Sequence, residues 1–130
     1  MTTYLDTSAL VKIVVDEEHS GALRRYLQPE DQLVSSALCR TELLRSMAGQ
    51  PSSVVRQAEA LLGSLQLMPL TDSLLDAAGR LRVAQLPFLR SLDALHLVSA
   101  QRLPDVRLVS YDRRMAAAAE PLSIATVCPR

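Results

Sequence analysis

Apolar residues follow two different patterns along this chain of 130 residues. Short continuous apolar runs are typical of buried strands, whereas apolar residues that recur every three or four positions indicate helices. The short runs predict strands over residues 3–5, 32–35, 66–70, 107–110 and 122–127. The periodic stretches predict helices over residues 9–15, 20–27, 38–47, 52–65, 72–84, 91–103 and 112–119. Strands that alternate with helices predict an α/β three-layer sandwich, in which helices cover both faces of a mostly parallel, twisted sheet.

Residues that cap or interrupt helices set several of these boundaries. Helix-capping side chains stand directly before an apolar period at three places: residues 6–8, Thr71 and Ser91. Pro51 follows the helix over 38–47, which it cannot continue because proline lacks the backbone N–H. The helix capped by Ser91 carries apolar residues on almost every face, which predicts that it is buried.

Length, charge and cysteine content narrow the class of protein. A chain of this length is expected to form one domain, over residues 1–130. The formal net charge of zero argues against a broad basic face that would bind nucleic acid. Lys12 is the only lysine, and the remaining positive charge is Arg, whose planar guanidinium suits phosphate or carboxylate oxygens. Cys39 and Cys128 show no zinc-ligand spacing. With no leader peptide and no apolar run of about 18 residues, we expect a cytoplasmic protein without a membrane segment.

Two acidic residues follow predicted strands directly. Asp6 ends the first strand and Asp112 follows the strand over 107–110, each at the turn into a helix. In an open parallel sheet, ligands bind outside the carboxyl ends of the strands, so both side chains are candidates for a functional site. Each one alone is equally compatible with a helix cap that satisfies free N–H groups.

Two further acidic residues lie on apolar helix faces. Glu42 falls between Leu38 and Cys39 on a helical wheel, and Asp93 shares its face with Leu97. A buried carboxylate must be paired, protonated or bound to a metal. The alternatives are a Glu42 side chain that bends to water or pairs with Arg45, and an Asp93 side chain that is stabilised by the helix dipole. His96, on a face adjoining that of Asp93, is interpreted as an ordinary core or surface histidine.

Taken together, the four carboxylates predict a metal site, which none of them predicts alone. If they converge at one sheet edge, their mutual repulsion is relieved by divalent cations bound between them. A site made of carboxylate oxygens, without Cys or His, suits Mg²⁺ or Mn²⁺. The acidic residues concerned are Asp6, Glu42, Asp93 and Asp112.

The segments that carry these acids resemble the acidic motifs of PIN-domain nucleases, in the same order and at similar intervals. The resemblance rests on Tyr4 to Leu10, Thr41 to Leu43, Leu89 to Leu97 and Ser110 to Asp112, and it extends from Tyr4 to about Val127. The segment Leu-Asp-Ala-Leu-His-Leu, which has an Arg before it, is particularly similar to VapC toxins of bacterial toxin–antitoxin pairs. The resemblance implies a PIN-like fold and a Mg²⁺-dependent endoribonuclease.

The resemblance also implies roles for individual residues. The four acids would form the catalytic quartet, with Asp6 and Asp93 as the most direct metal ligands. Candidate substrate contacts are Ser8, Arg90, Arg113 and Arg114. The implied partners are an RNA substrate, a VapB-type antitoxin and a second copy in a homodimer. The apolar hairpin over 38–65 is a candidate antitoxin surface, or else ordinary core packing.

Other classes fit the sequence less well. A phosphatase of the haloacid dehalogenase type needs an acid where Ser8 stands, and a phosphoacceptor receiver domain needs a late Lys that is missing. A PIN nuclease with an RNA-processing or DNA-directed role and no antitoxin stays open, as does a non-catalytic binding module. The RNA that is cut is not determined by the sequence.

Overall fold

The computed structural model describes residues 1–130 and contains every strand and helix that the sequence predicts. The strands are β1 (Thr2–Leu5), β2 (Gln32–Ser36), β3 (Gln66–Met68), β4 (Val106–Val109) and β5 (Ala125–Val127). The helices are α1 (Thr7–Val14), α2 (Ser20–Tyr26), α3 (Cys39–Ser46), α4 (Ser52–Ser64), α5 (Asp72–Arg80), α6 (Ser91–Gln101) and α7 (Arg113–Ala119).

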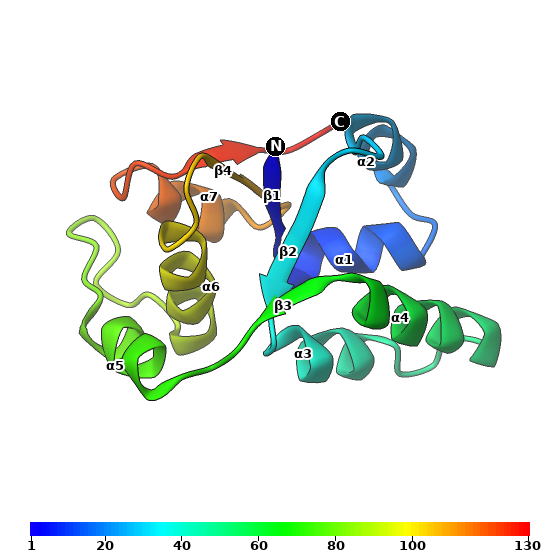
Figure 1. The fold of residues 1–130 in the computed structure, drawn as a ribbon, viewed down its shortest axis with the longest axis horizontal. Coiled ribbons are helices and arrows are strands. Elements are labelled where there is room, and N and C mark those ends of the chain that lie inside the picture. Colours follow the sequence, from blue (N-terminus) through cyan, green and yellow to red (C-terminus); the bar gives the residue numbers. More distant parts are fainter.

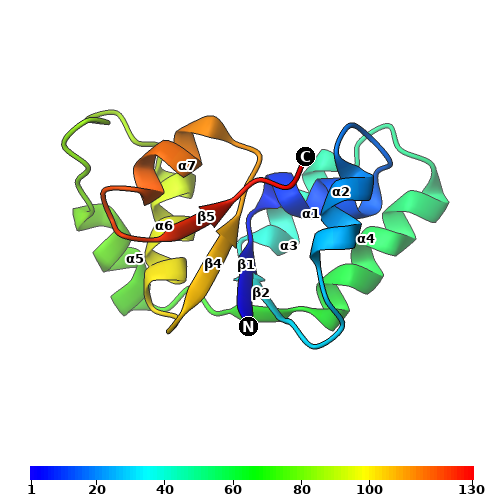
Figure 2. The same ribbon diagram turned by 90° about the horizontal axis from the view of Figure 1, so that it is seen from above.

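The five strands form one sheet in the order β3-β2-β1-β4-β5, and every neighbouring pair is parallel. Helices α1 to α4 lie on one side of the sheet and α5 to α7 on the other (Figures 1 and 2). The predicted three-layer α/β architecture is therefore confirmed. Because β1 is central and pairs with β4, the carboxyl ends of these two strands lie side by side.

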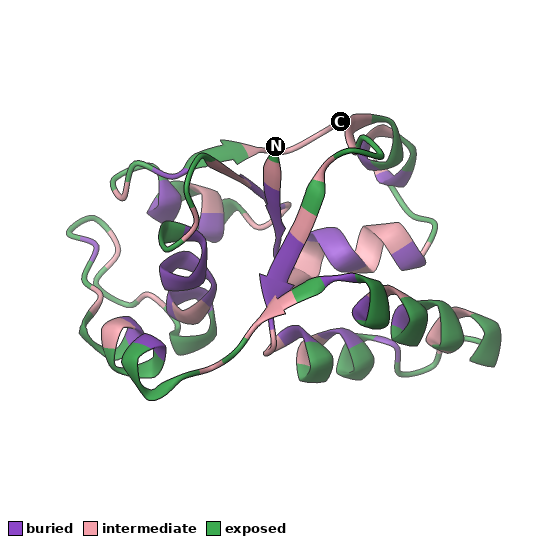
Figure 3. Cartoon of the chain, in the orientation of Figure 1, coloured by how far each residue is buried: buried purple, intermediate pink, exposed green.

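The core has two main parts, one on each side of the sheet. Tyr4 and Leu108 point to the side of α6 and α7, whereas Leu5 and Val109 point to the side of α1 and α3. This alternation follows from the two-residue period of side chains along a strand. The middle strands and the inner helix faces are accordingly buried (Figure 3). A sheet packed on both faces leaves its carboxyl edge as the place where polar side chains can gather.

The largest differences from the predicted ends, at α5 and β5, and the capping residue predicted for α6 each have a local reason. Helix α5 ends at Arg80 and not near residue 84, because Leu81 is extended and Val83 turns into the core. Strand β5 begins only at Ala125, after a turn in which Ser123 has a φ of 58°. Ser91 does not cap α6: it is the first helical residue, and the capping position belongs to Arg90.

None of the helices combines the length and the apolar character needed to cross a membrane.

Candidate active site

The four predicted acids surround one cavity at the carboxyl edge of the sheet. Asp6 follows β1, Asp112 follows β4, and the backbone N–H of Asp6 donates to the carbonyl of Val109, 3.3 Å away. Glu42 reaches the same place from α3, and Asp93 from the first turn of α6. The cavity has a volume of about 110 Å³ and is lined by Asp6, Thr7, Ser8, Glu42, Arg90, Asp93, His96, Asp112 and Met115.

Asp6 is held by donors on both carboxylate oxygens. Its Oδ1 accepts from the Ser8 hydroxyl at 2.6 Å and from the Ala9 backbone N–H at 3.0 Å, which makes Asp6 the N-cap of α1. Its Oδ2 accepts from the Ser110 hydroxyl. Burial raises the pKa of Asp6 although these hydrogen bonds lower it. The predicted capping role and the predicted site role thus fall on the same carboxylate.

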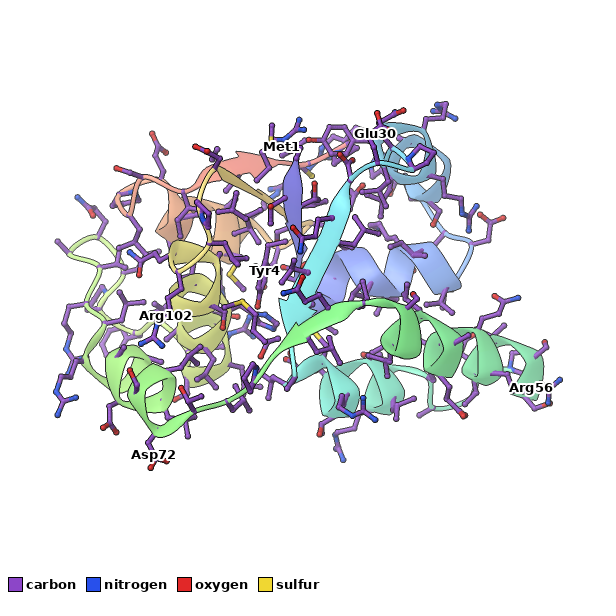
Figure 4. The ribbon with its side chains drawn as sticks, viewed as in Figure 1. Met1, Tyr4, Glu30, Arg56, Asp72 and Arg102 are labelled. Carbon is purple, nitrogen blue, oxygen red and sulfur yellow. The ribbon has the colours of Figure 1, made fainter.

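Glu42 takes part in a chain of hydrogen bonds that crosses from α3 to β1. Glu42 Oε1 lies 2.7 Å from His96 Nε2 and accepts from the Thr7 hydroxyl at 2.7 Å. The other ring nitrogen, His96 Nδ1, lies 2.7 Å from the Tyr4 hydroxyl. Figure 4 shows Tyr4 between β1 and α6. Tyr4 and His96 are almost completely buried, so packing fixes this chain.

The direction of these hydrogen bonds follows from the carboxylate of Glu42, which can only accept. His96 Nε2–H therefore donates to Glu42. This leaves Nδ1 as the acceptor for the Tyr4 hydroxyl, whose pKa burial keeps well above its ordinary value. Partial burial raises the pKa of Glu42, but the hydrogen bonds from His96 and Thr7, together with nearby positive charge that includes Arg90, outweigh it and leave the pKa lowered. Glu42 is therefore an oriented carboxylate, and its partner is His96, not Arg45.

Asp93 and Asp112 share one cation. Arg90 Nε donates to Asp93 Oδ2 at 2.9 Å, and Arg90 Nη2 donates to Asp112 Oδ2 at 3.1 Å. The hydrogen bond and charge of Asp93 raise the pKa of Arg90, with a smaller contribution from Asp112. Asp112 also caps α7 by accepting from the Arg114 backbone N–H at 2.9 Å. Asp93, with a side chain that is 9% exposed, is paired as a buried carboxylate requires.

Of the candidate substrate contacts, Ser8 and Arg90 line the carboxylate cavity, and Arg113 and Arg114 do not. Ser8 lines the cavity, but its hydroxyl donates to Asp6 and accepts from the Tyr111 backbone N–H, so it supports a carboxylate. Arg90 lines the cavity, whereas Arg113 does not. Arg114 lines a neighbouring pocket instead.

Sequence reasoning missed three residues that hold the acids in place: Thr7, His96 and Ser110. One signal for His96 was available, because it lies three residues after Asp93 and so near it on the helix surface. Thr7 directly follows Asp6, and Ser110 lies two residues before Asp112. Nothing in their spacing indicates which carboxylate they bind.

The donor set of this cavity fits a hard divalent cation. Four carboxylates face one guanidinium, and oxygen ligands of this kind are those that Mg²⁺ prefers. Glu42 and His96 also approach Cys39, with ligand atoms within 4.8 Å of one another, a grouping that the sequence does not indicate. Cys39 does not line the cavity, however, and its thiol lies behind the Thr7 hydroxyl at 3.6 Å. The carboxylates and His96 thus line the open space, and both ring nitrogens of His96 are already hydrogen-bonded to Tyr4 and Glu42.

Comparison with protein families identifies the origin of this arrangement. A family model described as PIN domain matches residues 3–121, which include all four acids. This chain belongs to the PIN-domain family. Among PIN-domain proteins, Ribonuclease VapC46 from Mycobacterium tuberculosis is 46% identical over 129 residues, which cover 97% of this chain and 96% of the relative. Ribonuclease VapC35 from the same species is 38% identical over 134 residues, with the same coverage. The resemblance to VapC proteins is therefore confirmed.

Solved structures share the PIN-domain fold at low sequence identity. VapBC2 from Rickettsia felis, bound to a DNA fragment from its promoter, has a TM-score of 0.74 and 14% identity over 100% of both chains. VapC20 from M. tuberculosis, described as a Sarcin-Ricin loop cleaving toxin, has a TM-score of 0.74 and 15% identity, covering 89% of this chain and 94% of that chain. These likenesses establish the PIN fold of this chain.

Proposed function

We propose that this PIN-domain protein is a Mg²⁺-dependent endoribonuclease that acts as the toxin of a toxin–antitoxin pair. The observation that carries the proposal is the convergence of four carboxylates on one cavity at the carboxyl ends of β1 and β4. The relatives named Ribonuclease VapC support the reaction and its RNA substrate. The residues that carry the reaction are Asp6, Glu42, Asp93 and Asp112.

Asp6 and Asp93 are the proposed metal ligands, since they are the two most buried acids of the cavity. When bound there, Mg²⁺ (or Mn²⁺) lowers the pKa of water and screens charge on the phosphate. Glu42, oriented by His96 and Thr7, accepts a proton from the attacking water or holds that water in place. Asp112, which lines the same cavity, orients a second water.

The phosphate of the substrate needs cationic contacts beside these acids. Arg90 already reaches into the cavity, and its guanidinium can leave the carboxylates for a phosphate once a metal neutralises them. Arg114 lies on the adjoining surface, and its side chain makes no ion pair within the chain. Arg113, exposed at the start of α7, is proposed as a more distant contact.

The proposed partners are a VapB-type antitoxin and a second copy of the chain. The structures of VapBC2 and of a toxin–antitoxin complex from Klebsiella pneumoniae support an antitoxin partner. The hairpin of α3 and α4 turns Leu43, Ala58 and Leu62 into the core and exposes Leu44 as its large apolar side chain. Core packing thus accounts for most of this hairpin. We propose a cytoplasmic location, in which the thiols of Cys39 and Cys128 stay reduced.

The test is cleavage of RNA by the purified chain, free of any antitoxin. Total RNA is incubated with Mg²⁺, with EDTA, and with the variant Asp93→Asn. Asp76→Asn is the matched control, because Asp76 is exposed on α5 and makes no ion pair. We expect Mg²⁺-dependent cleavage by the wild-type chain and by Asp76→Asn, and none with EDTA or by Asp93→Asn. Folded wild-type protein that neither cleaves RNA nor binds Mg²⁺ would show that the acids are only caps and ion-pair partners.

A further inference from the structure

A second pocket adjoins the carboxylate cavity, and its residues 85–89 play no part in the proposed chemistry. Its volume is about 290 Å³, just below the range of ligand pockets, about 300–1,000 Å³. Residues 85–89, in the loop between α5 and α6, form one side, and Arg114 of α7 forms another. Arg90 and Asp93 line this loop pocket and the carboxylate cavity alike, so a ligand can extend from one into the other. In Figure 2 the loop projects beside α7.

The loop presents an aromatic ring that the fold does not use. Phe88 is the only phenylalanine of the chain, and it is 93% exposed, far more than the other large apolar residues. Packing against the core therefore does not explain its position. A ring that is exposed to water beside a concave surface is available to cover a flat apolar ligand, and such a ligand would bury much of the area of the ring.

The loop pocket combines this ring with groups that suit a nucleotide. Leu86, Pro87 and Leu89 supply apolar contact, and the exposed Gln85 supplies an amide donor and an acceptor for the edge of a base. The guanidinium of Arg114 is a free cation on the same rim. Proteins that recognise single-stranded RNA commonly stack bases on aromatic side chains while Arg or Lys holds the phosphates.

We propose that the loop pocket binds the base of a nucleotide next to the scissile phosphate of single-stranded RNA, with that base stacked on Phe88. The inference rests on the proposed function in that the carboxylate cavity holds the phosphate. Continuity of the two cavities and the charge of Arg114 favour RNA over an apolar protein segment as the occupant. A duplex does not fit this role, because its bases are already stacked on each other.

The first test measures binding without cleavage. A fluorescent 12-nucleotide RNA of random sequence is titrated with the chain in Ca²⁺, which takes the same oxygen ligands as Mg²⁺. Loss of one stacked base weakens binding by about 5- to 150-fold, so we expect Phe88→Ala to raise Kd by about tenfold and Phe88→Tyr to leave it nearly unchanged. Leu92→Ala is the matched control, since Leu92 is also exposed, at 47%, but lines neither cavity. Because Phe88 is so exposed, its removal should leave the melting temperature unchanged.

The second test locates the contact. Ultraviolet crosslinking of the bound RNA, followed by trypsin, should label the peptide from Val83 to Arg90, which lies between two Arg cleavage sites. The label should disappear in Phe88→Ala. An unchanged Kd in Phe88→Ala, or crosslinks only outside this peptide, would overturn the inference. Crosslinking at Phe88 together with no cleavage in Mg²⁺ would support the loop pocket and refute the nuclease instead.

Discussion

The two halves of the carboxylate cavity are built from different interactions. Asp6 and Glu42 are held by hydroxyl, imidazole and backbone donors, most of which are buried. Asp93 and Asp112 share one guanidinium, that of Arg90, whose side chain is 56% exposed, and Asp112 also accepts from the Arg114 backbone N–H. One half therefore relies on packed, uncharged hydroxyl and amide donors together with the buried His96, and the other on an exposed ion pair.

This difference separates a rigid half of the site from an adjustable one. Buried donors that are themselves fixed by packing keep Asp6 and Glu42 in one geometry, which suits metal and water positioning. An ion pair with an exposed Arg is weak and exchangeable. A metal can thus replace Arg90 at Asp93 and Asp112, and Arg90 can turn to a phosphate, without disturbing the fold.

Asp6→Asn should have the largest effect on activity and a favourable one on stability. Mutation of supporting residues costs about 10–100-fold, so loss of a ligand should reduce cleavage by more than about 100-fold. Asn caps helices as well as Asp does, and the substitution removes a carboxylate whose pKa burial raises. The melting temperature in EDTA, measured by circular dichroism, should therefore stay the same or rise.

Magnesium provides the control for this variant. It should raise the melting temperature of the wild-type chain and leave that of Asp6→Asn unchanged, because only a bound ligand stabilises the fold. A variant that melts well below the wild type in EDTA would show that Asp6 is chiefly structural.

His96→Ala should lower kcat by about 10–100-fold with little change in KM, because His96 acts through the position of Glu42. His96→Gln, which keeps a donor, should recover part of the loss. Tyr4→Phe should give a smaller loss, since it removes only the donor to His96 Nδ1. The control is His19→Ala, which changes the other histidine of the chain. Equal losses at both histidines, or a rise in KM alone, would contradict the positioning role.

Arg90→Ala should act in opposite directions on metal and substrate. Without the competing guanidinium, the Mg²⁺ concentration that half-saturates cleavage should fall by about two- to fivefold, the size expected for an exposed ion pair. The KM for RNA should rise, because a phosphate contact is lost. Arg56→Ala, on the exposed surface of α4, is the matched control. A weaker response to Mg²⁺ would indicate that Arg90 is needed to position Asp93.

The effect of Glu42→Gln on the free energy of unfolding should be small, and its size should depend on pH. The pKa of Glu42 is lowered from 4.5 in the folded chain, so its ionised form contributes stability above that pH. This contribution is lost as the pH falls through the folded pKa, where wild-type Glu42 becomes protonated. Urea unfolding in EDTA should therefore distinguish the variant from the wild type more at about pH 7 than at about pH 3. A difference that grows toward acid pH would reverse the sign and contradict the lowered pKa.

Local sequence patterns predicted which helices and strands form better than they predicted the residues at which these begin and end. Periodicity identified α5 and β5, but their limits depend on Val83 entering the core and on a left-handed turn at Ser123. The same limit applies to α6, where Ser91 has the capping residue type but Arg90 occupies the capping position. Terminal residues are decided by what packs next to them, and that information is not local.

The α/β architecture and the positions of the four acids at strand ends and helix faces could be predicted from the sequence, because each depends on spacing within a short segment. The groups that hold those acids could not, because they come from distant parts of the chain. His96 meets Glu42 across 54 residues, and Arg90 meets Asp112 across 22. Such pairs depend on how α3, α6 and α7 pack around β1, to within the length of a hydrogen bond. A periodic pattern specifies a face of a helix, but not the atom that the face will meet.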